Sequence, residues 1–141
     1  MYLTRELIEP NQFYRANEEC ESGAQVLFFG TVRRLNAGRE VIYLEYEAYE
    51  KMAVQMIREE VERSFQKWSL TKIKILHRLG RVGLGEIAVA IHVASAHRDE
   101  AYQASSHLIE EIKYRIPIWK KEYFADGASV WSLCQREHAH A

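Results

Sequence analysis

The stretch EIAVAIHVASA, residues 86–96, is dominated by Val, Ile and Ala and predicts a strand that is mostly buried. Residues 98–116, which follow it, change to helical spacing. Their apolar positions form one face of a helix, made of Ala101, Ser105, Leu108, Ile112 and Ile116. Pro117 disfavours helical backbone at the residue before it, so this helix is expected to stop at Ile116.

Two further strands are predicted on the N-terminal side of this unit. Residues 23–34 are rich in β-forming residues, and residues 39–49 alternate between the two faces of a strand. The four residues between them, 35–38, have turn chemistry, with Asn36 and Gly38 able to take a positive φ. The two strands are therefore expected to form a hairpin.

A second main helix is expected over residues 49–68, where the apolar period changes again. Its apolar stripe is predicted to contain Met52, Met56, Ile57, Val61, Phe65 and Trp68. The shorter predicted elements are a helix over 10–20, a strand over 72–80, a glycine turn over 81–86, and a strand or loop over 117–124. The pattern predicts an α+β domain in which antiparallel hairpins are covered by two main helices.

The length and charge of the chain limit what it can be. Its 141 residues fit a single domain, 1–141, with a tail, 132–141, that is expected to be flexible. The 19 basic and 20 acidic residues give a net charge of −1, which argues against general nucleic-acid binding but leaves room for a local basic pocket. With no signal peptide and no long apolar run, the chain is expected to be soluble and cytoplasmic, without a membrane segment.

Neither a metal site nor a cofactor is expected. The two cysteines, Cys20 and Cys134, are far apart and show no metal-ligand spacing. Neither lies in a basic cluster that would favour a reactive thiolate. No nucleotide-binding glycine motif and no zinc spacing occur in the sequence.

Basic residues recur at the ends of the predicted elements: Arg33 with Arg34, His97 with Arg98, Lys113, and Lys120 with Lys121. At the start of the helix over 98–116, free backbone N–H groups together with His97 and Arg98 could hold an anion such as phosphate. The alternative is that Arg98 points into solvent or pairs with Glu100 or Glu45.

Lys113 and Lys120 each allow two interpretations. Lys113 flanks the apolar stripe of its helix, so it could extend its ammonium from the core, or it could only pair with the helix C-terminus. Lys120 could enter a pocket or could be an exposed edge-strand lysine. If the segment is extended, Lys120 and Lys121 point to opposite faces, so only one of them enters a pocket with the other basic groups.

Four long motifs occur in one order along the chain: FFGTVRRLNAGREVIYLEYEAYEKMA, HRLGRVGLGE, SAHRDEAY and IKYRIPIWKKE. In these motifs the chain resembles the MoaE family, the large, catalytic subunits of molybdopterin synthase. The likeness runs from about Gly23 to Trp131.

The resemblance implies an α/β hammerhead-like fold and a homodimer. Each end of the dimer would bind a small ubiquitin-like sulfur-carrier subunit, which gives a heterotetramer. The carrier's C-terminal Gly-Gly tail, activated as a thiocarboxylate, would enter a pocket of the large subunit. There it would donate sulfur to cyclic pyranopterin monophosphate, and two such transfers would form molybdopterin, the ligand of the molybdenum cofactor.

The resemblance also implies a set of site residues. Thr31, Val32 and Arg33 would line the pterin site, and His97 and Arg98 would contact the substrate. The pocket would be completed by Lys113, Lys120, Lys121 and Glu122, with Lys113 and Lys120 as the catalytic candidates. His97 and Arg98 are expected to be contributed across the dimer. Two other function classes stay open: a non-catalytic binding module for a phosphorylated metabolite, and a scaffold whose basic residues form only surface pairs.

Overall fold

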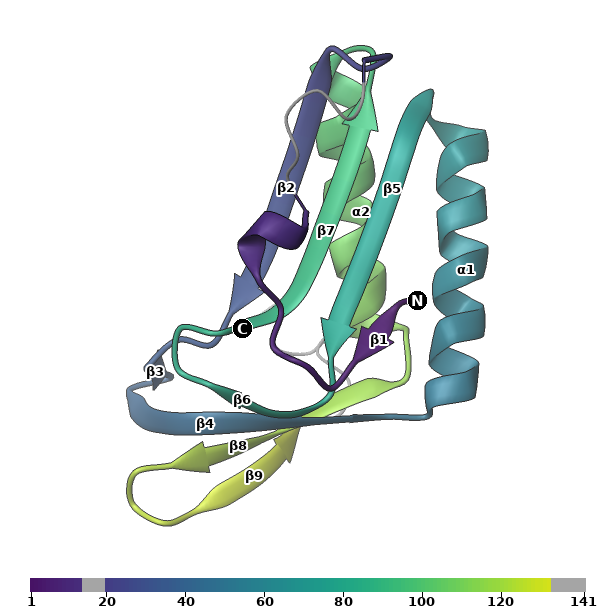
Figure 1. Ribbon diagram of the computed structural model, residues 1–141. Helices are drawn as coiled ribbons and strands as arrows, with labels where there is room; N and C mark the ends of the chain where they lie inside the picture. The colour runs from purple at the N-terminus through teal and green to yellow at the C-terminus, as the bar shows by residue number, and fades with distance from the viewer. Residues whose placement is uncertain (14–19, 133–141) are drawn as a thin grey trace.

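The computed structural model describes residues 1–13 and 20–132 and shows two sheets that cross one another (Figure 1). The first sheet has the strand order β1-β5-β7-β2. The short β1 pairs with β5 in parallel, and the other pairs are antiparallel. Its strands are β1 (Leu3–Thr4), β2 (Ala24–Thr31), β5 (Leu70–Arg78) and β7 (Ile87–Ser95).

The second sheet lies across one end of the first (Figure 1). It has the order β3-β4-β8-β9, and β6 also pairs with β4. Its strands are β3 (Leu35–Asn36), β4 (Arg39–Ala48), β6 (Gly80–Gly83), β8 (Ile118–Phe124) and β9 (Ser129–Ser132). Because β4 is paired on both sides, it is the central strand that carries β6 and β8.

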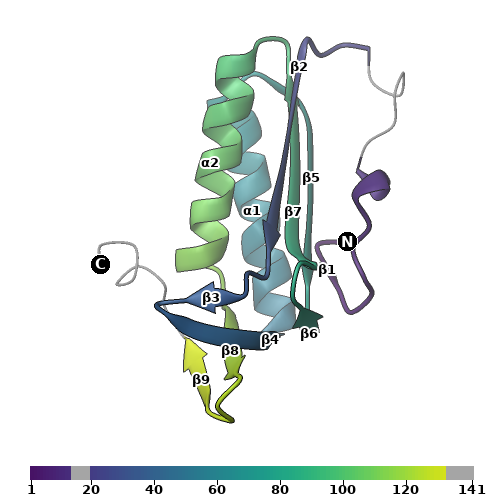
Figure 2. The same cartoon turned by 90° about the vertical axis from the view of Figure 1, so that its left-hand side faces the viewer.

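Strand β7 is the centre of the core, and all nine of its residues are buried. Both of its faces are covered, which explains why it has no polar alternation. Helices α1 (Glu50–Lys67) and α2 (Arg98–Tyr114) lie side by side on one face of the sheet (Figure 2). On the other face, Ile8 and Phe13 of the N-terminal segment pack with Ile87 and Ala90. The predicted α+β domain with two covering helices is confirmed.

The buried face of α2 is the one that the sequence predicts. Ala101, Ser105, Leu108, Ile112 and Ile116 are all buried. The helix ends at Tyr114, two residues before the predicted end, because Arg115 already leaves the helical backbone ahead of Pro117.

No helix in the described part of the chain is long and apolar enough to cross a membrane.

The stripe predicted for α1 is partly wrong. Met52 and Phe65 are 56% and 43% exposed, whereas Ala53, Ile57, Glu60 and Ser64 are buried. The buried face is rotated relative to the apolar pattern and includes Glu60, whose carboxylate is bound at 2.9 Å by Arg63 of the same helix and by Arg115 at the end of α2. A paired carboxylate can be buried where the sequence pattern alone predicts an apolar side chain.

The predicted hairpin of residues 23–34 with 39–49 is wrong as well. Strand β2 pairs with β7, and β4 pairs with β6 and β8, so the two predicted strands lie in different sheets. A hairpin forms only between β3 and β4, where Ala37 and Gly38, rather than Asn36, take positive φ values of 52° and 78°. Alternation shows that a segment is a strand but does not identify its partner.

Three smaller expectations have mixed outcomes. The glycine turn predicted over 81–86 begins as strand β6, and the turn itself is confined to its end. The N-terminal helix is a single 3₁₀ turn, Pro10–Gln12, and residues 14–19 lie outside the described part. The tail from 133 onward also lies outside it, so its flexibility and the single domain over 1–141 stay predictions.

Shortening Leu108 to Ala should destabilise the fold by about 2–5 kcal/mol, because this side chain is 1% exposed and leaves a cavity in the main core. Phe65→Ala is the matched control on the other helix. This truncation removes more atoms but should cost less than Leu108→Ala, since Phe65 is 43% exposed and leaves no enclosed cavity. Urea unfolding of both variants measures the difference. Equal losses would contradict the observed rotation of α1.

Candidate functional site

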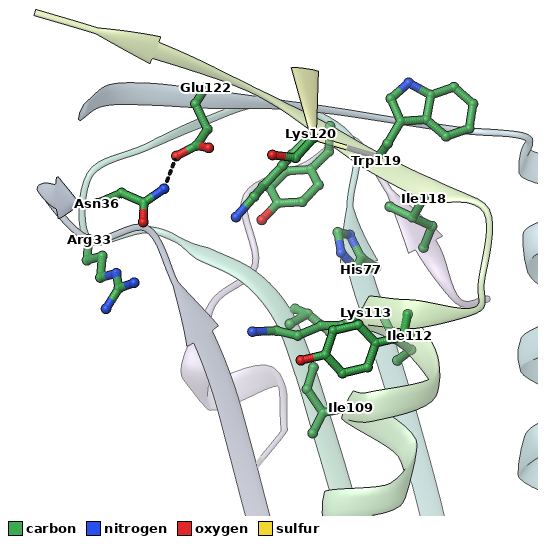
Figure 3. Close-up of a pocket in the computed structure, with 14 residues that line it drawn as sticks. Arg33, Asn36, His77, Ile109, Ile112, Lys113, Ile118, Trp119, Lys120 and Glu122 are labelled. Carbon is green, nitrogen blue, oxygen red and sulfur yellow. Dashed lines mark hydrogen bonds between the residues drawn. The ribbon is translucent and has the colours of Figure 1, made fainter. Parts of the chain in front are cut away.

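A pocket of about 310 Å³ lies where the C-terminal end of α2 meets the second sheet (Figure 3). Its polar lining comes from five strands, from α2 and from the loop between β2 and β3, and consists of Arg33, Asn36, Tyr46, His77, Lys113, Tyr114, Lys120, Glu122 and Ser132. Its apolar lining consists of Val89, Ile109, Ile112, Ile118 and Trp119. The pocket therefore combines an apolar wall with several basic groups.

The turn between α2 and β8 brings Lys113 and Lys120 into this one pocket. Ile116 and Ile118 are buried on either side of Pro117, and the Ile118 N–H donates to the Ile116 carbonyl at 2.7 Å. The chain reverses there, so the last turn of α2 and the first residues of β8 face each other. Figure 3 shows the two lysine side chains extending into the space between them.

Strand β8 divides its own charged residues between two faces. Lys120 and Glu122, two residues apart, both line the pocket. Lys121 lies on the opposite face, with its ammonium 5.1 Å from the Tyr123 ring centroid and 5.4 Å from that of Trp131. The prediction that only one of the two adjacent lysines enters the pocket is confirmed, and that lysine is Lys120.

The ammonium of Lys120 has a lowered pKa. Burial lowers its pKa, and the positive charges of Lys113 and Arg33 lower it further, against the opposing effect of Glu122. Glu122 is itself buried, at 7% exposure, and accepts a hydrogen bond from Asn36 Nδ2 at 2.5 Å. The lysine is therefore poised to lose a proton more readily than a lysine in water.

Two further pocket residues are uncharged. Burial lowers the pKa of His77 to about 4, although its hydrogen bond to the Arg78 backbone acts in the opposite direction. Burial and the nearby Glu122 raise the pKa of Tyr46 to about 12. At neutral pH the pocket thus has a neutral imidazole and a protonated phenol beside its cations.

The comparisons with known proteins agree with one another. Residues 3–115 match the family of MoaE proteins. The chain belongs to the MoaE family. It is 43% identical over 125 residues to the molybdopterin synthase catalytic subunit of Bacillus subtilis, which covers 89% of this chain and 80% of that relative. It is also 37% identical over 129 residues to the subunit of the same name from Thermoplasma volcanium, covering 92% of this chain and 94% of that one.

Solved structures show the same MoaE fold. The crystal structure of molybdopterin synthase from Staphylococcus aureus matches with a TM-score of 0.84 and 40% identity, over 93% of this chain and 95% of that one. A complex of subunits 1 and 2 of molybdopterin-converting factor from Helicobacter pylori matches with a TM-score of 0.76. Its identity is 19%, over 93% of this chain and 88% of that one, so it supports the fold alone.

The function that goes with MoaE membership is that of a molybdopterin synthase catalytic subunit, which acts in molybdenum cofactor biosynthesis. The resemblance found in the sequence is therefore confirmed, and with it the enzyme class. The non-catalytic binding module and the scaffold are not retained.

The structure brings together only some of the residues that the MoaE resemblance implied. Arg33, Lys113, Lys120 and Glu122 line the pocket. Thr31 is exposed at the end of β2, and Val32 is buried in an apolar cluster with Val41, Leu44, Val82, Ala88 and Phe124. Within one chain neither of these side chains lines the pocket, nor does Lys121.

His97 and Arg98 lie at the other end of α2 from the pocket. Arg98 and Lys113 are fifteen positions apart in the sequence, so about 22 Å of helix lies between them. Both residues are exposed. They therefore do not join Lys113 and Lys120 in the pocket of the same chain.

His77 and Tyr46 are pocket residues that sequence reasoning did not select. His77 is buried near the end of β5, where its ring lies 4.9 Å from that of Tyr46 on β4 and lines the pocket. The register that sets Tyr46 opposite Lys120 belongs to the β4–β8 pair. No local pattern in the sequence signals that pairing.

One group of possible metal ligands lies elsewhere, between the two helices. Glu60, His107 and Glu111 place ligand atoms within 4.8 Å of one another. Arg63 and Arg115 already bind the same carboxylates, Arg115 contacting both Glu60 and Glu111. The cluster is therefore an ion-pair network that joins α1 to α2.

The buried neutral His77 should make the protein less stable in acid. Between the ordinary pKa of 6.5 and the folded-state value of about 4, the unfolded chain binds a proton that the folded chain does not. The free energy of unfolding is therefore not reduced by His77 above pH 6.5. Below that pH it falls by about 1.4 kcal/mol per pH unit. Urea unfolding of the wild type and of His77→Asn, at about pH 7 and pH 5, should show the wild type losing about 2 kcal/mol more than the variant. An equal loss in both would contradict the assignment.

Proposed function

We propose that this pocket is where sulfur passes from the thiocarboxylated Gly-Gly tail of a small ubiquitin-like carrier subunit to cyclic pyranopterin monophosphate. The observation that carries the proposal is the convergence of Arg33, Lys113 and Lys120 on one pocket with an apolar wall. A substrate with a planar ring and a phosphate needs that combination, because the ring packs on apolar surface while cations bind the phosphate.

The basic groups suit the bond changes of this reaction. The thiocarboxylate sulfur forms a bond to an electrophilic carbon of the pterin side chain, and the cyclic phosphate opens. Water then cleaves the acyl–sulfur bond, so that the sulfur stays on the pterin and the carrier leaves as a carboxylate. Negative charge develops at the phosphate and at the acyl oxygen, and nearby cations stabilise it.

Lys120 is the proposed proton carrier of the pocket. Its lowered pKa makes the neutral amine accessible, so it can take a proton from the attacking water or attack the acyl carbon itself. Lys113 lines the same pocket and is the proposed partner of the phosphate. Because the sulfur arrives on the carrier, no cysteine of this chain is needed in the reaction.

The assembly is part of the proposal. The Helicobacter pylori structure is a complex of two subunits of molybdopterin-converting factor, and we propose that this chain likewise binds a small subunit. We propose a homodimer with one carrier at each end. The cytoplasmic location expected from the sequence stays a prediction.

The proposed active site is shared between protomers. His97 and Arg98 are too far from Lys113 along α2 to serve the same pocket, yet their exposed position leaves them available to a partner chain. Thr31, Val32 and Lys121 keep their proposed substrate role only through the backbone or through rearrangement on binding, since their side chains do not line the pocket.

Lys120→Ala should lower turnover on the order of 10²-fold or more, because a catalytic proton carrier is lost. Lys120→Arg should fail as well, since a guanidinium keeps the charge but does not give up its proton. Carrier binding should persist in both variants, because one lysine is a small part of a protein interface. Single-turnover assays with the thiocarboxylated carrier measure the first effect and calorimetry the second. An active arginine variant would leave Lys120 as an electrostatic contact only and favour Lys113 for the chemistry.

Mixing two inactive variants tests the shared site. Homodimers of Arg98→Ala and of Lys120→Ala, each inactive alone, should regain part of the activity after subunit exchange. Mixed dimers then contain one pocket with both residues intact. The matched control mixes Lys113→Ala with Lys120→Ala, two residues of one pocket, and should not gain activity. Absence of recovery in the first mixture, with exchange demonstrated by mass, would place the whole site within one chain.

A further inference from the structure

His77 holds an unused hydrogen-bond acceptor at the back of the pocket. Its Nδ1 lies 2.8 Å from the Arg78 backbone oxygen, so Nδ1 carries the proton and donates it there. In the neutral ring Nε2 then has a lone pair and no proton. No group among residues 1–13 and 20–132 hydrogen-bonds this atom, and it is not among the enclosed polar atoms that lack a partner. The remaining surroundings of Nε2 are the pocket that His77 lines.

The ring is held in that orientation from two sides. The Arg78 carbonyl fixes Nδ1, and the Tyr46 ring lies edge-to-face with the imidazole, at 4.9 Å between centroids. Figure 3 shows His77 between Lys120 and Lys113, behind the space into which the two lysines extend. A fixed, buried acceptor of this kind imposes a requirement on whatever fills the pocket, because leaving it unpaired carries a desolvation cost.

His77 Nε2 and the basic side chains of the pocket bind chemically different parts of a ligand. A lone pair repels phosphate and carboxylate oxygens, which also carry lone pairs, so His77 cannot bind the anionic group. It can bind an N–H donor. A pterin ring has N–H groups on its pyrimidine edge, whereas Arg33, Lys113 and Lys120 serve the phosphate.

We propose that His77 is a specificity-determining residue that accepts a hydrogen bond from an N–H group of the pterin ring and so fixes which edge of the ring faces the back of the pocket. This inference rests on the proposed function, because it takes the pterin as the occupant. It adds the orientation of the ring: the N–H edge lies toward β5, and the phosphate lies toward the cations of β8 and α2.

Two substitutions separate this role from a structural one. His77→Gln places an amide oxygen near the position of Nε2 and keeps the pocket acceptor. His77→Asn places an amide near Nδ1, so it keeps the contact with Arg78 but does not reach the pocket. A structural role favours the Asn variant, and a ligand-binding role favours the Gln variant.

The binding experiment uses two simple probes, unphosphorylated pterin and inorganic phosphate, titrated into the full chain. His77→Asn should weaken pterin binding at least tenfold and leave phosphate binding unchanged. His77→Gln should stay within about threefold of the wild type for both probes. Lys113→Ala is the reciprocal variant, which should lose phosphate and keep pterin. The matched control is His92→Asn, since His92 is an equally buried histidine of the neighbouring strand that does not line the pocket.

Several results would overturn the proposal. These are a His77→Asn variant that binds pterin like the wild type, a parallel loss of phosphate binding, a larger loss in the Gln than in the Asn variant, and a wild type that does not bind pterin at all. If the Asn variant does not fold, nitrogen NMR of ¹⁵N-histidine in the wild type decides the matter. The His77 Nε2 resonance should move on addition of pterin and not on addition of phosphate, and an unmoved resonance would contradict the proposal.

Measurements of enzymatic turnover distinguish a failure of this inference from a failure of the proposed function. With the thiocarboxylated carrier, His77→Asn should raise KM for the pterin substrate at least tenfold with kcat little changed, as expected when uniform binding is lost. A wild type that binds pterin through His77 but transfers no sulfur would defeat the proposed function alone. An active wild type whose KM is unaffected by His77→Asn would defeat this inference alone.

Discussion

The complete burial of β7 is the constraint on which the rest of the structure depends. A strand with nine buried residues is stable only if both of its faces are covered, because its apolar side chains would otherwise meet water. Helices α1 and α2 cover one face, and the N-terminal segment with Ile8 and Phe13 covers the other. The second sheet crosses the end of this packed unit (Figure 1), and the pocket forms at that crossing.

The position of the pocket explains its electrostatics. It opens between packed layers, so the groups that enter it are partly removed from water, and burial dominates the shifts of Lys120, His77 and Tyr46. Burial acts against every charged form, which lowers the pKa of the lysine and keeps the imidazole and the phenol neutral. Burial thus accounts both for a lysine that can give up its proton and for the neutral His77 and Tyr46 side chains beside it.

Helix α2 carries basic groups at both of its ends. Its C-terminal turn provides Lys113, and its N-terminal end presents His97 and Arg98 at a distance of about 22 Å. Its position is fixed by the core contacts of Leu108 and Ile112 and by the Glu60 network with α1. In the proposed dimer, this helix completes one pocket at its C-terminal end and contributes to the partner's pocket at its N-terminal end.

The sequence by itself determined the α+β class, the buried strand, the apolar face of α2, and the motifs that carry the MoaE resemblance. It also separated Lys120 from Lys121, because strand alternation is a local property. The tertiary structure decided the strand partners, the rotation of α1 around Glu60, the distance of Arg98 from Lys113, and the entry of His77 and Tyr46 into the pocket. These features depend on contacts between residues far apart in the chain, and the period of a single segment determines its exposed and buried faces but not the segment that covers them.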